Sequence, residues 1–147
     1  MPDSHGSFSF HIIEDVMLIT AAGAWNLECV EAYITEAERI YAETGSVRMH
    51  LVIFFNRWDG ATPDAIARLV KYTRDCLARD MFRSQTYFHR ESPFLSRMVM
   101  SFFAAAGNYE QRTFFKREDL LLHIAARMSP ERLSAFTALF DTLAGTP

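Results

Sequence analysis

The residue types and spacings that support common enzyme chemistry are missing from this sequence. It contains no glycine-rich phosphate loop, no glycine fingerprint for a dinucleotide, no Gly-x-Ser-x-Gly elbow, no His-Glu-x-x-His and no Cys-x-x-Cys. Its histidines lie in different predicted elements and never pair at the spacing of helical metal ligands. We therefore predict a protein without a cofactor, without a metal and without catalytic activity. No sequence motif supports the enzymatic alternative, in which His89 acts with Asp59.

Three polar turns that follow predicted strands are the candidate binding sites. Ligands of open α/β sheets bind beyond the carboxyl ends of the strands, where side chains from successive turns meet. The turns are Gly23–Asn26, Asn56–Thr62 and His89–Ser92. The candidate binding residues in them are Trp25, Asn26, Asn56, Arg57, Trp58, Asp59, Thr62, His89 and Arg90. Whether the three turns open on one edge depends on the strand order, which the sequence does not specify.

The middle turn offers the most varied chemistry. Arg57 supplies a cation, Trp58 supplies a flat apolar face, and the amides at the start of the following helix favour an anion. The alternative is purely structural: Asn56 and Asp59 form the turn, Trp58 covers the edge of the core and Thr62 caps the helix. Both interpretations stay open at this point.

The stretch Leu51–Ala65 sets the architecture that positions these turns. It begins with an apolar run that ends at Phe55, passes through the polar turn and starts a helix at Thr62-Pro63. A run that is apolar on both faces is typical of a central strand covered by helices, and a strand that leads into a helix is half of a parallel α/β unit. The sequence therefore favours an α/β fold.

The other elements follow from apolar residues recurring with period 2 or period 3.6. The predicted strands are Ser7–Ile13, Val16–Ala21, Val47–Phe55, Gln85–Phe88 and Tyr109–Phe115. The predicted helices are Leu27–Glu43, Pro63–Arg79, one from Pro93 to Gly107, Glu118–Met128 and one that starts at Ser129-Pro130. The order ββαβαβαβαα predicts a mixed β-sheet with an N-terminal antiparallel hairpin, later parallel strands and helices packed on the sheet. We predict a single domain over residues 1–147, with residues 129–147 as an appended C-terminal helix.

Length and composition fit a single domain of ordinary size, since the chain has 147 residues of which half are hydrophobic. Cys29 and Cys76 lie in predicted helices, which favours two reduced, at least partly buried thiols over a disulfide. No apolar run reaches the roughly 18 residues of a membrane span, and the first residues lack the pattern of a signal peptide. We therefore expect a cytoplasmic protein.

Charge is unevenly distributed along the chain, although the net charge is only −3. Residues 1–64 carry 10 acidic and 3 basic side chains, whereas residues 65–97 carry 3 acidic and 7 basic ones. This asymmetry is compatible with two opposed surface patches or with ordinary solvated helix faces. The mild negative charge argues against a dedicated nucleic-acid binder.

The 13 phenylalanines include the adjacent pairs Phe54-Phe55, Phe102-Phe103 and Phe114-Phe115. Neighbouring residues of a strand point to opposite faces of the sheet. In a strand pair, the two rings therefore lie under covering helices or line a pocket for a hydrophobic ligand. A core position is the commoner of the two for phenylalanine.

Several segments together resemble the SpoIIAA-like branch of the STAS superfamily, which is named for sulfate transporters and anti-sigma factor antagonists. They are the hairpin, the break at Gly23 before an amphipathic helix, the buried strand Leu51–Phe55, and the segments YFHRESPF and QRTFFKREDLLLHI. The resemblance spans about Phe8 to Ala126 and is carried by element order and apolar pattern. It implies a sheet with helices packed against it, no cofactor, and use as a regulatory or ligand-binding module. Members of this branch are also similar in shape to the CRAL-TRIO lipid carriers.

The antagonists of this family are switched by phosphorylation of a serine in an Asp-Ser-Ser-Gly type motif before the second helix. The matching stretch here is Asp59-Gly60-Ala61-Thr62, in which Thr62 is the only nearby hydroxyl. A phosphate on Thr62 would be stabilised by the amides at the helix start but repelled by the nearby carboxylates of Asp59 and Asp64. Thr62 is therefore a candidate phosphorylation residue whose other interpretation is a plain N-cap.

Two hypotheses for function come from these features. The first is a non-enzymatic STAS-like regulatory module that binds a protein partner, or itself, through the turn Asn56–Thr62 and the adjoining helix. The second is a carrier or sensor of a small hydrophobic or acidic ligand held between the aromatic strands and a helix. Neither hypothesis involves nucleic acid or a membrane span.

Overall fold

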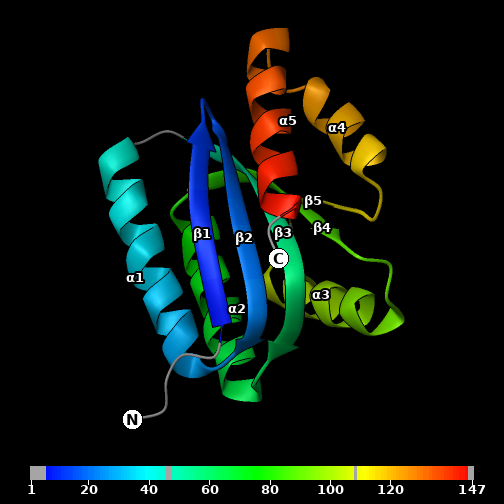
Figure 1. Cartoon of the computed structure of the whole chain (residues 1–147). Coiled ribbons are helices and arrows are strands. Elements are labelled where there is room, and N and C mark those ends of the chain that lie inside the picture. Colours follow the sequence, from blue (N-terminus) through cyan, green and yellow to red (C-terminus); the bar gives the residue numbers. More distant parts are fainter. Residues whose placement is uncertain (1–5, 46–47, 108, 146–147) are drawn as a thin grey trace.

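The computed structural model describes residues 6–45, 48–107 and 109–145. These residues form strands and helices in the predicted order (Figure 1). The strands are β1 (Gly6–Ile13), β2 (Val16–Trp25), β3 (Met49–Ala61), β4 (Phe82–His89) and β5 (Glu110–Phe114). The helices are α1 (Leu27–Thr44), α2 (Pro63–Ala78), α3 (Pro93–Ala106), α4 (Arg117–Ala125) and α5 (Pro130–Ala144). Val47, the first residue of one predicted strand, lies outside the described residues.

The strands form one mixed sheet in the order β1-β2-β3-β4-β5. β1 and β2 are antiparallel and the later pairs are parallel, which confirms the predicted fold class. The hairpin has the predicted two-residue connection: Ile13 pairs with Val16, and Glu14 adopts a positive φ of 55° that closes the turn without a glycine. Because sequential parallel strands are neighbours, each crossover helix moves the chain one strand along the sheet.

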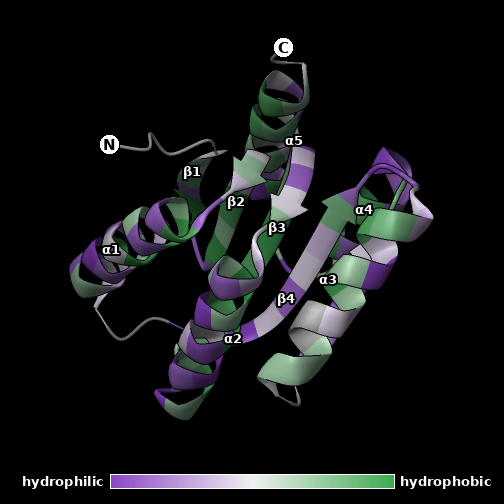
Figure 2. Cartoon of the chain, turned by 90° about the horizontal axis from the view of Figure 1, so that it is seen from below, coloured by the Kyte–Doolittle hydropathy of each residue, from purple (hydrophilic) through white to green (hydrophobic). Residues whose placement is uncertain are grey.

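Helices cover both faces of the sheet, with α1, α2 and α3 on one face and α4 and α5 on the other (Figures 1 and 2). β3 divides its side chains between the two resulting clusters. Leu51, Ile53 and Phe55 pack under α1 to α3, whereas Val52 and Phe54 pack under α4 and α5. The strand is therefore buried on both faces, as its continuous apolar run predicts.

The adjacent phenylalanines of the strands are divided in the same way. Phe54 and Phe55 lie in opposite clusters. Phe114 packs against the cluster under α4 and α5, whereas Phe115 stays 41% exposed beside His89. The side chains of Phe102 and Phe103 lie outside the described part of the structure.

Two of the three predicted turns are strand in the structure. β2 continues through Gly23 to Trp25 and β3 continues to Ala61, because these two strands keep pairing until Trp25 lies opposite Ala61. β-bulges absorb the irregular residues, with positive φ angles at Gly23 (75°), Arg57 (57°) and Gly60 (102°). The predicted break at Gly23 and the predicted middle loop are therefore wrong.

Residues 129–147, for which the sequence suggests an appended helix, include α5, which packs on the sheet. Phe136 and Phe140 of α5 are 0% and 2% exposed. The ring of Phe140 makes edge contacts with Phe54 of β3 and Phe88 of β4, at centroid distances of 5.1 and 5.2 Å. α5 thus supplies part of the core on this face.

The acidic first part of the chain and its basic middle meet in ion pairs. Arg68 of α2 pairs with Glu31 of α1 at 2.8 Å, and Arg79 pairs with Glu38 at 2.6 Å. Exposed pairs of this kind contribute little stability each. They do offset the opposite charges of the two helices, so the charge asymmetry of the sequence does not become two separate patches over α1 and α2.

Candidate functional site

The three predicted sites lie at one edge of the sheet. β2, β3 and β4 are parallel neighbours, and their carboxyl ends are Trp25, Ala61 and His89. The carboxyl ends of parallel neighbours meet at the same edge, which also carries the starts of α1, α2 and α3. The strand order therefore shows that the three predicted turns lie at the same edge of the sheet, which the sequence does not specify.

A cleft of about 240 Å³ opens at this edge between β3 and β4. β3 pairs with β4 only as far as Phe55, which lies opposite His89, and then follows β2. The two strands separate at that point. The cleft is lined by Phe54, Phe55, Asn56, Arg57, Trp58, Phe88, His89, Arg90 and Leu95. Five of the predicted binding residues therefore meet in it, from two different predicted turns.

Arg57 and Arg90 give the cleft its positive charge. Both residues are exposed, and neither forms an ion pair with another described residue. The neighbouring Asn56 is already engaged, since its Nδ2 donates to the carbonyl of Leu143 in α5 at 3.4 Å. The two guanidinium groups are therefore the groups of the cleft best able to bind an anion.

His89 is almost fully buried at the inner end of the cleft, with 1% of its surface exposed. Its Nδ1 lies 2.7 Å from the carbonyl oxygen of Arg90; a carbonyl only accepts, so Nδ1 carries the proton. Its ring makes edge contacts with Phe55 and Phe115, and its Nε2 has no partner among the described residues. Asp59 does not line the cleft, so the structure does not assemble the His89 and Asp59 pair considered as an enzymatic alternative.

The remaining predicted site residues are Trp25, Asn26, Asp59 and Thr62, and none of them lines the cleft. Asn26 caps α1, its Oδ1 accepting from the amide of Cys29 at 2.9 Å. Thr62 stands at the N-cap position of α2 but makes no capping hydrogen bond; its hydroxyl donates to the Asp64 carboxylate. This hydrogen bond lowers the pKa of Asp64. Thr62 is exposed, and it stays a candidate for phosphorylation that these contacts do not test.

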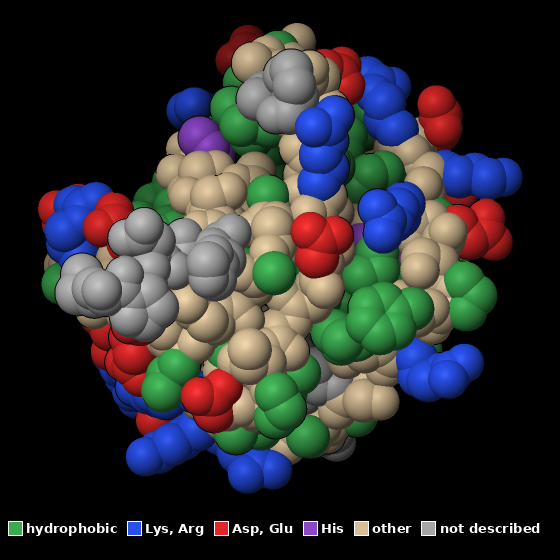
Figure 3. Space-filling view, turned by 60° about the horizontal axis from the view of Figure 1, so that its bottom comes forward, with side chains coloured by type: hydrophobic (Ala, Val, Ile, Leu, Met, Phe, Trp, Pro, Cys, Tyr) green, Lys and Arg blue, Asp and Glu red, His purple; other side chains and the backbone are tan. Residues whose placement is uncertain are grey.

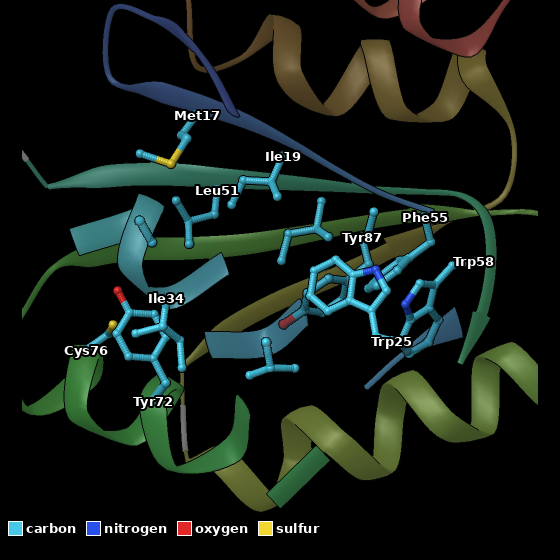
Figure 4. Close-up of a cluster of buried hydrophobic side chains, with 14 of the residues drawn as sticks. Met17, Ile19, Trp25, Ile34, Leu51, Phe55, Trp58, Tyr72, Cys76 and Tyr87 are labelled. Atoms are coloured by element: carbon cyan, nitrogen blue, oxygen red, sulfur yellow. The ribbon is translucent and has the colours of Figure 1, made fainter. Parts of the chain in front are cut away.

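Behind the cleft, a cavity of about 70 Å³ lies between the sheet and helices α1, α2 and α3. Its lining combines strand residues with inward residues of all three helices, among them Trp25, Tyr33, Tyr41, Leu51, Phe55, Trp58, Leu69, Tyr72, Cys76, Gln85 and Met98. Figure 4 shows several of these side chains converging from the sheet and the helices. Phe55 and Trp58 line both the cavity and the cleft, so these two rings form the wall between the two spaces.

The polar groups of the cavity are mostly satisfied by the protein itself. The hydroxyl of Tyr72 donates to Glu38 at 2.9 Å, and the side-chain oxygen of Gln85 accepts from Tyr87 at 2.7 Å. Burial raises the pKa of the Cys76 thiol to about 11, and the two buried cysteines do not form a disulfide with each other. The cavity is therefore neutral and mainly apolar.

Sequence reasoning raised a pocket between the aromatic strands and a helix as one alternative, but of the residues that line this cavity it named only Trp25 and Trp58 as binding residues. Tyr33, Tyr41 and Met98 lie on helix faces whose apolar period marks them as inward, but such a pattern does not show whether packing fills the space. Tyr72 lies three residues after Leu69 and four before Cys76, so it is on the inward face of α2, and this spacing is the signal that could have identified it. Its burial depends on the neighbouring helix α1, which supplies the Glu38 partner.

Two structural tests concern metals and membranes. Within residues 6–45, 48–107 and 109–145, no three His, Cys, Asp or Glu side chains gather closely enough to hold a metal ion. In the same ranges, no helix combines the length and the apolar character needed to cross a membrane.

Comparisons with solved structures show the fold of the chain. No protein-family model and no curated protein matches the chain. A solved structure of an uncharacterised DUF3478-family protein with a SpoIIAA-like fold, from Shewanella loihica PV-4, is similar with a TM-score of 0.59 and 15% identity. The likeness covers 85% of this chain and 98% of that one.

The phosphorylated form of the Bacillus cell fate determinant SpoIIAA is similar with a TM-score of 0.54 and 13% identity. The match covers 80% of this chain and 99% of that one. At these identities the likeness concerns the fold. The chain thus has a SpoIIAA-like fold of the STAS type, as its element order and apolar pattern predict.

Proposed function

We propose that this protein is a non-enzymatic regulatory module that binds an acidic segment of a protein partner, or of a second copy of itself, at the cleft between β3 and β4 and the adjoining start of α2. The observation that carries the proposal is the meeting of five predicted binding residues in one cleft at the carboxyl edge of the sheet. The fold supports a regulatory use, because a solved protein of this fold is described as a cell fate determinant.

The surface around the cleft has the composition of a protein-binding site. Arg57 and Arg90 are exposed and have no acidic partner among the described residues. Phe94, near the start of α3, is 59% exposed, and Phe115 beside His89 is 41% exposed. Figure 3 shows hydrophobic side chains gathered beside basic ones on one face of the molecule. Exposed aromatic rings next to unpaired arginines are enriched at protein interfaces.

The test compares two charge-reversed double variants as bait for partner capture. Arg57→Glu with Arg90→Glu reverses the charge of the cleft, whereas Arg83→Glu with Arg112→Glu makes the same change at exposed positions on β4 and β5 away from the cleft. We expect a protein captured by the wild type to bind roughly tenfold more weakly to the cleft variant and normally to the control. Equal capture by both variants would rule out the cleft as the binding surface.

A second candidate function is the binding of a small, mainly apolar ligand. The cavity between the sheet and α1 to α3 favours it, because its lining is neutral, aromatic and mainly apolar, the composition typical of ligand sites. Native mass spectrometry of the purified protein tests this function and reports the oligomeric state in the same spectrum. We expect an adduct of a small molecule that is lost when the protein is denatured. The bare mass of the chain in every preparation would count against this function.

A further inference from the structure

The two tryptophans of the chain line the same cavity but differ in how their indole N–H groups are used. Trp25 is 4% exposed, and its Nε1 donates to the carbonyl of Ala22 at 3.0 Å. Trp58 is 6% exposed, and its buried Nε1 has no acceptor among the described residues. Figure 4 shows the nitrogen of Trp58 on the side of its ring that faces the other labelled side chains. A buried N–H without a partner is rare in native proteins, so this group calls for an explanation.

No described residue around the cavity accepts a hydrogen bond from this N–H. The side-chain oxygen of Gln85 already accepts from Tyr87 and, at 3.4 Å, from Tyr109. The hydroxyl of Thr73 donates to the carbonyl of Leu69 at 3.0 Å. The wall of the cavity is mainly apolar, and Trp58 Nε1 is a buried donor in it that has no acceptor among the described residues.

We propose that the cavity takes a small apolar molecule with one neutral hydrogen-bond acceptor, a carbonyl oxygen, and that Trp58 Nε1 donates to that oxygen. The lining contains no charged side chain, so a carboxylate would lose its hydration without gaining a counter-charge. A neutral carbonyl satisfies the donor at a much smaller desolvation cost. This inference rests on the second proposed function and specifies the chemistry of its ligand.

Cyclopentanone and methylenecyclopentane test the inference, because they have the same shape and differ only in carrying C=O or C=CH₂. The readout is the pair of indole N–H signals in a ¹H–¹⁵N NMR spectrum, titrated with each probe. With cyclopentanone, we expect the Trp58 signal to move downfield as its hydrogen bond forms. With methylenecyclopentane, we expect only the small shifts that come from filling the cavity.

Trp58→Phe removes the donor and keeps an aromatic ring. We expect this variant to bind cyclopentanone about fivefold more weakly relative to methylenecyclopentane, as the loss of one hydrogen bond implies. Trp25→Phe is the matched control, because the N–H that it removes is already bonded to Ala22; its preference between the probes should equal that of the wild type.

The outcomes separate the inference from the function on which it rests. If both probes bind the wild type equally well and Trp58→Phe does not change their ratio, the cavity binds apolar molecules but the assigned hydrogen bond is wrong. Trp58 Nε1 would then be satisfied by a bound water. If neither probe binds, the ligand-binding function and the inference both fail.

Discussion

At the scale of single residues, Trp58 shows how one side chain reconciles two opposed interpretations of the sequence. Its ring covers the edge of the core, as the structural interpretation expects, and is 6% exposed. It also lines the cleft that contains Arg57 and His89, as the binding interpretation expects. Sequence reasoning offered both interpretations for Trp58 but not that its ring lies between the core and the cleft, because this position depends on how β3 continues beyond Phe55.

The contrast between the two indoles predicts different costs for similar substitutions. Trp25→Phe removes a hydrogen bond to Ala22, whereas Trp58→Phe removes an N–H that has no partner in the protein. Both variants lose similar ring volume from the same cavity lining. We therefore expect Trp25→Phe to reduce the free energy of unfolding by about 1 kcal/mol more than Trp58→Phe. Urea unfolding of the two variants measures the difference, and equal losses would contradict the assignment of the hydrogen bonds.

At the scale of elements, the sequence predicts the first part of β3, up to Phe55, but not its continuation to Ala61. The run up to Phe55 is apolar on both faces and was correctly predicted as a buried strand. The following Asn, Asp and Gly residues are typical of turns, and local propensity therefore predicts a loop. The strand continues because the end of β2 pairs with it, and such a pairing between distant segments leaves no local pattern in the sequence.

Gly60 makes this strand continuation sensitive to substitution. Its φ of 102° is strained for other residues, and an added Cβ would lie 3.3 Å from the sulfur and methyl of Met98 in α3. Gly45 is a control, because it also has a positive φ, 72°, but no atom within 4 Å of an added Cβ. We expect both alanine variants to lose about 1–3 kcal/mol, with the larger loss at Gly60. Thermal unfolding compares them, and an equal or larger loss for Gly45→Ala would show that Met98 does not restrict this site.

At the scale of the whole molecule, the order of elements and the mixed sheet follow from the sequence, because apolar periodicity and capping residues are local signals. Two other features cannot be predicted from the sequence: the position of α5 over Phe54 and the cavity under α1 to α3. Both depend on how side chains from many segments fill space. The five residues of the cleft were named from the sequence, but their meeting depends on the strand order and on the separation of β3 from β4.

The stability of the molecule is expected to depend on pH through His50 and His123. Burial lowers the pKa of both imidazoles, and the charge of Arg127 lowers them further. Below about pH 6.5, the unfolded chain therefore binds more protons at these positions than the folded protein does. The free energy of unfolding should be highest above that pH and should fall as the pH drops through the lowered folded-state pKa values.

Urea unfolding at about pH 7.5 and about pH 5.5 checks this expectation, since carboxylates titrate mainly at lower pH. The double variant His50→Gln with His123→Gln should lose less stability between the two pH values than the wild type. An identical loss in both proteins would assign the pH dependence to other groups.

The central claim is that this SpoIIAA-like protein acts by binding a partner at the cleft between β3 and β4. Hydrogen exchange of the backbone amides, measured with and without a captured partner, tests it most directly. We expect the partner to slow exchange in residues 56–62 and 89–95, which border the cleft, while α4 and α5 on the other face exchange as before. Slower exchange confined to α4 and α5, with no change around the cleft, would contradict the claim.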